Sequence, residues 1–227
     1  MTTTETSLGR LATLDPAFAQ LVGATAKHVR AIPELTEREK TFLCVTADVC
    51  QASLGLAFTA HVRAGLAAGV STSDVRELLR FVSYDCGYHA ATAGIERIAE
   101  LEAELGIDPE LTAPEPVPDG PSPLPDEVRT RLNELDPHFT GYFDLQSRMR
   151  AGHGPGTLSE RERGLVSLSV DVHYQTLEDT FRIHVGRALR GGAPPDDVRA
   201  ALRFIAQFGV TRAWHAWEAL NAILAES

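Results

Sequence analysis

Two histidines at matching positions are the clearest candidates for chemistry in this chain of 227 residues. His61 and His184 each follow a phenylalanine by three residues (Phe58 and Phe181) and a leucine by seven. This spacing places each histidine on the apolar, inward stripe of a helix. Burial favours a neutral imidazole, which can take up a proton near neutral pH. We therefore predict two catalytic histidines, with the phenylalanines as substrate-binding neighbours; a hydrogen-bonded core histidine is the alternative interpretation.

A second polar group occurs only in the first half. Asp85 and His89 are four residues apart, so on one continuous helix they share a face, where a carboxylate can orient an imidazole. A surface ion pair is the alternative. Tyr84 and Tyr88 flank this pair and are candidate substrate-binding residues. Cys50 joins them as a binding candidate rather than a nucleophile, because no neighbouring base is evident to activate its thiol.

The second half has a different candidate set around His184. His173 lies eleven residues before it, and Glu178 precedes it by six residues, where the first half has a glycine. A carboxylate beside an imidazole is an acid–base pair, so Glu178 and His173 are predicted catalytic residues; an exposed helix carboxylate is the alternative for Glu178. Asp48 and Asp171 occupy matching positions in the two halves, where each either caps a helix or orients a histidine.

The elements that position these residues form an internal repeat. Residues 35–104 and 158–227 align without a gap at an offset of 123, with 22 identities in 70 positions. No convincing alternation of β-branched residues occurs, so the fold is predicted to be all-α. We expect two tandem helical repeats, 1–107 and 126–227, with the segment 108–125 between them. That segment contains seven of the thirteen prolines, which is typical of a semi-rigid linker.

Helix-start signals recur in both halves. Asp15 and Asp136 are each followed by proline, which predicts an Asp N-cap with proline at the first helical position. Thr36 and Ser159 each precede a glutamate by three residues, which predicts two capping boxes. The last helix of each half is expected to run to the end of that half, from near Ser73 in the first and from near Pro195 in the second.

Composition excludes several classes of protein. A net charge of −10 and a pI of about 5.2 disfavour a nucleic-acid partner. No apolar run reaches the ~18 residues of a membrane span. Three cysteines, without C-x-x-C spacing, argue against a disulfide framework and predict a cytoplasmic protein. No H-x-x-x-H pair occurs, and His173 and His184 would lie about 16 Å apart on a straight helix, so no metal is expected.

Several segments together resemble a known family. Leu-Thr-Glu-Arg-Glu at 35–39, an apolar helix, then His-Val-Arg-Ala-Gly-Leu-Ala-Ala-Gly-Val at 61–70 and Ser-Asp-Val-Arg-Glu-Leu-Leu at 73–79 resemble the carboxymuconolactone decarboxylase / alkylhydroperoxidase D-like superfamily. The resemblance covers about 35–95 and, more faintly, 158–220. It implies an all-α fold and a homo-oligomer, trimeric or larger. The peroxidase-like branch is excluded, because the positions of its C-x-x-C motif hold no cysteine and dithiol chemistry needs thiols.

The resemblance implies a cofactor-independent enzyme of the decarboxylase branch. Its substrate would be a small cyclic or aromatic-derived carboxylic acid or lactone, and specialised (polyketide or aromatic) metabolism is one setting for such a reaction. Loss of CO₂ leaves an enolate, and an imidazole moves the proton. Only His61 and His184 carry over directly from the family pattern. Three alternatives remain: a metal-dependent oxygenase, a cofactor-free isomerase or cyclase, and a non-catalytic ligand-binding protein.

Overall fold

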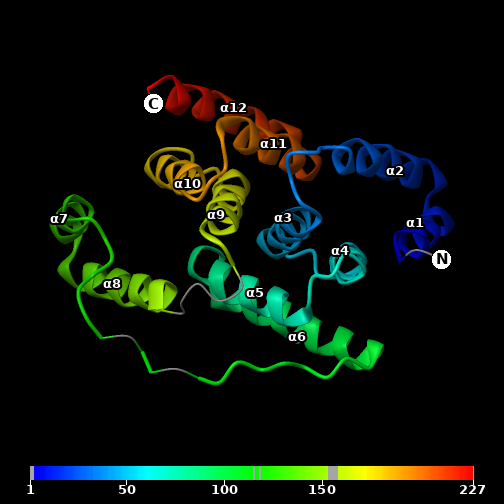
Figure 1. Ribbon diagram of the computed structural model, residues 1–227, viewed down its shortest axis with the longest axis horizontal. Coiled ribbons are helices and arrows are strands. Elements are labelled where there is room, and N and C mark those ends of the chain that lie inside the picture. Colours follow the sequence, from blue (N-terminus) through cyan, green and yellow to red (C-terminus); the bar gives the residue numbers. More distant parts are fainter. Residues whose placement is uncertain (1–2, 115, 118, 153–157, 227) are drawn as a thin grey trace. The chain divides into compact units, whose positions relative to one another are not determined.

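The protein is described by a computed structural model that covers residues 3–114, 116–117, 119–152 and 158–226. Within these residues all regular elements are helices, which confirms the all-α prediction (Figure 1). In chain order they are α1 (Thr3–Leu14), α2 (Pro16–Arg30), α3 (Glu37–Cys50), α4 (Leu56–Ala67), α5 (Thr72–Cys86), α6 (Tyr88–Leu105), α7 (Asp126–Leu135), α8 (Pro137–Gly152), α9 (Glu160–Tyr174), α10 (Asp179–Arg190), α11 (Pro195–Ile205), a 3₁₀ turn η1 (Ala206–Phe208) and α12 (Val210–Ala225).

The chain divides into two compact units that do not follow the predicted repeat boundaries. The larger combines Met1–Glu110 with Leu158–Ser227, and the smaller is Leu111–Thr157. The larger unit contains helices of both halves, α1 to α6 and α9 to α12. The smaller unit contains the proline-rich segment with α7 and α8, where the Arg129 guanidinium lies 3.2 Å from the Asp144 carboxylate. The two halves of the sequence therefore share one core.

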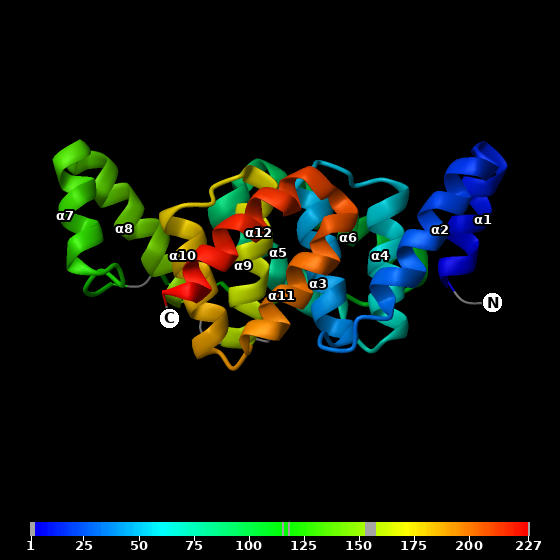
Figure 2. The same ribbon diagram turned by 90° about the horizontal axis from the view of Figure 1, so that it is seen from above.

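The larger unit is layered. Helices α3 and α9 lie side by side at its centre, with α4 packed on α3 and α10 packed on α9 (Figures 1 and 2). The pair α5 and α6 covers one face of this central layer, and α11 and α12 cover the other. The helices that carry His61 and His184 thus belong to the same layer, on opposite sides of the α3–α9 contact.

Capping boxes define the starts of the two central helices, as the sequence predicts. Thr36 caps α3 and accepts the backbone N–H of Glu39, whose carboxylate accepts the N–H of Thr36 in return. Ser159 and Glu162 form the same reciprocal pair at the start of α9. Each box satisfies two of the N–H groups that a helix start leaves unpaired.

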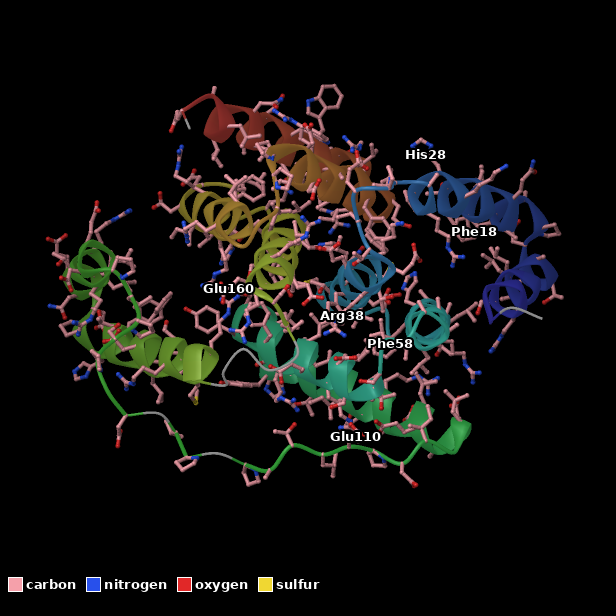
Figure 3. The ribbon with its side chains drawn as sticks, in the orientation of Figure 1. Phe18, His28, Arg38, Phe58, Glu110 and Glu160 are labelled. Atoms are coloured by element: carbon pink, nitrogen blue, oxygen red, sulfur yellow. The ribbon has the colours of Figure 1, made fainter. Side chains whose placement is uncertain are left out.

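The same two glutamates also join the halves. Arg38 donates from Nε to Glu162 at 2.8 Å, and Arg161 donates from Nε to Glu39 at 2.5 Å (Arg38 is labelled in Figure 3). Both glutamates are buried. A buried carboxylate needs a cation and hydrogen bonds to offset its desolvation. Each half therefore supplies the cation that the cap of the other half requires.

The helices α1 and α7 are additions to the predicted set. α1 ends directly before Asp15-Pro16, and α7 ends directly before Asp136-Pro137. Asp15 accepts the backbone N–H of Phe18 at 2.9 Å, and Asp136 accepts that of Phe139 at 2.6 Å, so both predicted N-caps are present.

The long fourth helix predicted in each half is interrupted, and that prediction was wrong. Gly87, with φ of +86°, separates α5 from α6, and Gly209, with φ of +154°, lies between η1 and α12. Glycine adopts such backbone angles without the steric cost of a Cβ atom. Asp85 and His89 consequently belong to different helices, so the four-residue spacing does not place them on one helix face.

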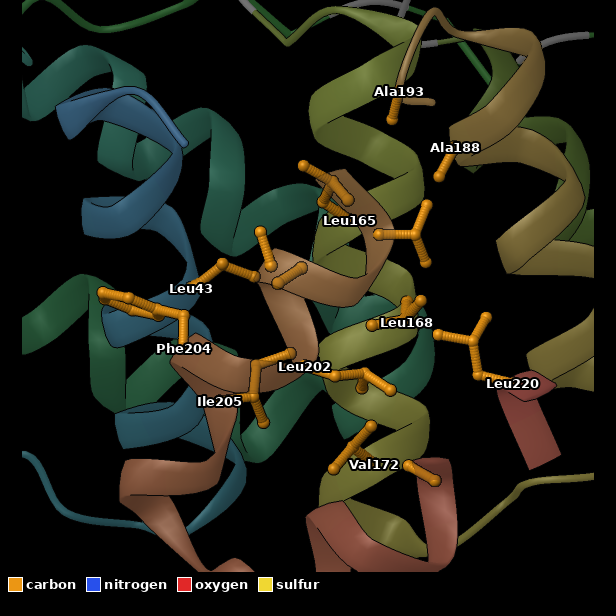
Figure 4. Close-up of a cluster of buried hydrophobic side chains, with 14 of the residues drawn as sticks. Leu43, Leu165, Leu168, Val172, Ala188, Ala193, Leu202, Phe204, Ile205 and Leu220 are labelled. Carbon is orange, nitrogen blue, oxygen red and sulfur yellow. The ribbon is translucent and has the colours of Figure 1, made fainter. Parts of the chain in front are cut away.

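Two hydrophobic clusters each mix residues of both halves. In one, Leu43 of α3 packs with Leu165, Leu202 and Phe204 of the second half (Figure 4). In the other, Val166 of α9 packs with first-half residues. Fully burying a side chain of this size stabilises the fold by about 1.5–3 kcal/mol. Neither half has a complete core of its own.

Candidate active site

An aspartate–histidine pair links α3 to α4. The Nδ1 atom of His61 lies 2.7 Å from Oδ2 of Asp48. Asp48 is inside α3 rather than at its end, so it orients the histidine instead of capping a helix. The carboxylate is buried, whereas the His61 side chain is 27% exposed. The ring therefore donates Nδ1–H to Asp48 and keeps its other nitrogen, Nε2, for other partners.

A matching pair joins α9 to α10. Nδ1 of His184 lies 2.6 Å from Oδ2 of Asp171, whose other oxygen accepts a hydrogen bond from Thr176. Only 10% of the His184 side chain is exposed, so this pair is more enclosed than the first. Glu178, predicted as the partner of His184, is exposed immediately before α10. The structure places Asp171 in that role instead.

A cysteine completes the first pair. Cys44 lies one helical turn before Asp48 on α3, and its side chain hydrogen-bonds to His61. Burial by itself lowers the pKa of His61, but the interactions with Cys44 and Asp48 outweigh burial and raise the pKa well above its ordinary value. The expectation of a neutral ring was therefore wrong for His61, because it left these partners out. Burial also raises the pKa of Asp48, an effect that the hydrogen bond from His61 partly offsets.

Second-half residues border His61. The ring of Phe208, in η1, meets the His61 ring edge-on at a centroid distance of 6.1 Å. On its other side Phe208 lies 6.0 Å from the ring of His173, on α9. Nδ1 of His173 is 2.7 Å from the carbonyl oxygen of Ser169. Burial lowers the pKa of His173. A neutral His173 that donates Nδ1–H to Ser169 keeps a lone pair on Nε2.

Arg212 brings a positive charge to this border. Its guanidinium donates to the side-chain oxygen of Gln51 at 3.1 Å and to the carbonyl oxygen of Phe208 at 2.8 Å. Burial is the largest influence on the pKa of His173, and the hydrogen bond to the Ser169 backbone is the second. The positive charge of Arg212 comes third, and it lowers this pKa further. Among the ion pairs of the described residues, none involves Arg212. This guanidinium is therefore a candidate to bind an anionic oxygen of a ligand.

The remaining first-half candidates gather elsewhere. Cys50 hydrogen-bonds to Tyr174 and lies within electrostatic range of Asp85 and Cys86. Burial raises the pKa of Cys50 to about 12 and that of Cys86 to about 11, so both remain thiols at neutral pH. This cluster contains two predicted residues, Cys50 and Asp85.

The five other predicted residues differ in exposure. Tyr88 is 52% exposed and His89 is also exposed, both at the start of α6, while Tyr84 is partly buried on α5. Phe58 and Phe181 are completely buried one turn before the histidines (Phe58 is labelled in Figure 3). The two phenylalanines therefore support the histidine-bearing helices from inside the core instead of lining a surface that a substrate can reach.

Sequence reasoning missed three residues: Cys44 and Phe208, which interact with His61, and Arg212, which donates to Phe208. One signal was available for Cys44. It precedes Asp48 by four residues, and Ser167 precedes Asp171 by four residues at the same offset of 123. A small polar residue thus recurs one turn before each aspartate. Phe208 and Arg212 had no comparable signal, because their position depends on how the two halves pack.

Neither a metal site nor a membrane-spanning helix occurs among the described residues. No group of three or more His, Cys, Asp or Glu side chains in this part of the chain could hold a metal ion. No described helix is long and apolar enough to cross a membrane.

Comparison with known proteins supports the family predicted from the sequence. The family model described as "Carboxymuconolactone decarboxylase family" matches residues 139–222. A crystal structure from Burkholderia xenovorans LB400, provisionally assigned as a gamma-carboxymuconolactone decarboxylase subunit, has a TM-score of 0.57 and 22% identity, over 97% of this chain and 91% of that chain. No curated protein matches the chain. The family model therefore matches part of the second half of the chain, and the solved structure shares the fold of this chain.

Proposed function

We propose that the chain is a carboxymuconolactone decarboxylase-like lyase whose working site is built around His61. Its substrate is a small cyclic or aromatic-derived carboxylic acid or lactone. The observation that carries the proposal is the Asp48–His61 pair, in which a buried carboxylate orients a partly exposed imidazole whose pKa is raised. A raised pKa keeps the ring protonated at neutral pH, which makes it a proton donor.

The protein must do two things in this reaction: stabilise an enolate and donate a proton. When CO₂ leaves, the bonding electrons move into the conjugated carbonyl and form an enolate. Arg212 is the cation available to hold the enolate oxygen, with neutral His173 beside it. The His61 imidazolium then donates its Nε2 proton to the substrate carbon, and Asp48 holds the ring in the orientation for transfer. No metal or organic cofactor enters this scheme.

The Asp171–His184 pair can be compared directly with the Asp48–His61 pair, because both lie in the same chain. It has the same Asp–His geometry but less exposure, and the residue that matches Cys44 is the completely buried Ser167. We therefore assign turnover to the first pair. The proposal also includes a homo-oligomer, trimeric or larger, which would cover exposed apolar side chains such as Leu14, Phe18 and Leu21. A cytoplasmic location fits three free thiols.

The test measures CO₂ release from ¹³C-carboxyl-labelled lactones, beginning with gamma-carboxymuconolactone, in wild type and in two matched variants. His61→Gln is expected to lower kcat by about 10²–10⁴-fold, the usual contribution of a positioned acid or base. His184→Gln is expected to keep most of the activity. The proposal is wrong if His184→Gln abolishes turnover while His61→Gln retains it. A product that still carries the labelled carboxyl would identify an isomerase or cyclase instead.

A further inference from the structure

In the decarboxylation scheme Cys44 helps to raise the pKa of His61 but takes no chemical step of its own. Cys44 hydrogen-bonds to His61, and Nδ1 of His61 lies 2.7 Å from Asp48. A thiol, an imidazole and a carboxylate that orients the imidazole are the three parts of a nucleophilic triad. The two α3 residues are one helical turn apart, so both face the same side chain of α4.

The exposure along α3 singles out Cys44. Every residue from Glu39 to Val49 is buried except Cys44, which is partly exposed together with His61. A nucleophile must be accessible to its substrate. In this stretch of α3, Cys44 is the residue that is accessible. The other two cysteines, Cys50 and Cys86, lack a neighbouring imidazole in the described contacts.

We infer that Cys44 is a catalytic nucleophile and that the site has a second activity, the opening of a lactone or activated ester through a thioester on Cys44. The inference rests on the proposed function only in using the same site and the same class of carbonyl substrate. An imidazolium next to a thiol favours the thiolate, which is the reactive form. Asp48 acts as a positioning residue, because it orients His61 without touching the substrate.

The steps balance without an oxidant or cofactor. The Cys44 thiolate attacks the lactone carbonyl carbon, a C–S bond forms, and the ring C–O bond breaks. The leaving alkoxide takes a proton from the His61 imidazolium. Neutral His61 then removes a proton from water, the resulting hydroxide attacks the thioester, and the Cys44 thiolate leaves beside the regenerated imidazolium. The products are a hydroxy acid and the starting form of the enzyme.

The test uses p-nitrophenyl acetate as the probe with the full-length chain. We expect a burst of p-nitrophenol and, by peptide mass spectrometry, one acetyl group on Cys44. Cys44→Ala should lose the burst, and His61→Gln should slow acetylation at least 100-fold. Cys86→Ala and Ser167→Ala are the matched controls and should acetylate at the wild-type rate. Acetyl groups on Cys50, Cys86 or lysine only, or an unchanged burst in Cys44→Ala, would overturn the inference.

A pH profile separates positioning from a merely structural role. The titratable groups that interact with His61 are Cys44 and Asp48, both on α3, and Phe208 separates them from His173 on α9 and Arg212 on α12. As the pH is raised, the rate of acetylation should fall at a lower pH in Asp48→Asn than in wild type. The reason is that the variant no longer stabilises the imidazolium. An unshifted profile in a folded Asp48→Asn protein contradicts the assignment of Asp48.

The same samples distinguish failure of this inference from failure of the proposed function. Wild type that releases CO₂ in a His61-dependent manner but never acetylates Cys44 refutes only the thioester. Wild type that acetylates Cys44 but shows no His61-dependent release of CO₂ refutes only the decarboxylase.

Discussion

Replacing Asp48 with asparagine tests the electrostatic basis of the site. The substitution keeps the shape of the side chain but removes the charge that lies 2.7 Å from Nδ1 of His61. A hydrogen bond to a charged group contributes about 1.5–3 kcal/mol. Because that energy favours the protonated ring, its loss should lower the pKa of His61. The interaction with Cys44 remains in this variant and still raises the pKa of His61, so the substitution should remove only part of the increase.

The measurement is an NMR titration of the ¹³C-labelled histidine rings, assigned with His61→Gln. Asp171→Asn is the matched control, since it removes the equivalent carboxylate from His184 and should leave the His61 titration unchanged. In activity assays, a proton donor is active only below its pKa. The alkaline limb of the rate profile should therefore move to lower pH in Asp48→Asn, by as much as the titration of His61 itself moves.

Two outcomes would refute this reasoning. An unchanged His61 titration in Asp48→Asn would show that the carboxylate does not stabilise the imidazolium. A lowered pKa of His61 with an unchanged rate profile would show that His61 is not the group whose protonation controls turnover.

Three further predictions concern stability. A Cβ atom at Gly164 would lie 2.5 Å from backbone atoms of α10, so Gly164→Ala should cost about 1–3 kcal/mol in urea denaturation, whereas Gly23→Ala, where nothing lies within 4 Å, should cost none. Arg161→Ala should lower the free energy of unfolding by about 3 kcal/mol, because buried Glu39 loses its cation; adding Glu39→Gln should recover part of that loss, and no recovery would contradict the ion-pair explanation. The lowered pKa of His173 means that the unfolded chain binds its proton more readily, so stability should fall as pH drops below about 6.5, and this acid sensitivity should be smaller in His173→Gln.

Local signals in the sequence predicted much of the fold. Thr36 and Ser159 are N-caps because their three-residue spacing to glutamate encodes a reciprocal hydrogen bond. The inward position of His61 followed from its spacing to Phe58. The break at Gly87 was missed, because an isolated glycine in an apolar pattern is compatible with a continuous helix.

The site was only partly predictable for a physical reason. Asp48 and His61 are thirteen residues apart on different helices, so sequence spacing could not choose between capping and orienting. Phe208 reaches His61 through the packing of the two halves, which depends on many small contacts and not on a local pattern. The raised pKa of His61 likewise depends on Cys44, whose role appears only when α3 and α4 are placed together.

Holding both Asp–His pairs in one polypeptide has an evolutionary consequence. In an assembly of identical single-repeat chains, every substitution appears at all equivalent positions at once. Here a codon change alters one pair and spares its counterpart, so cysteine at position 44 coexists with serine at position 167. One copy is then free to acquire new reactivity while the other preserves the architecture that both depend on.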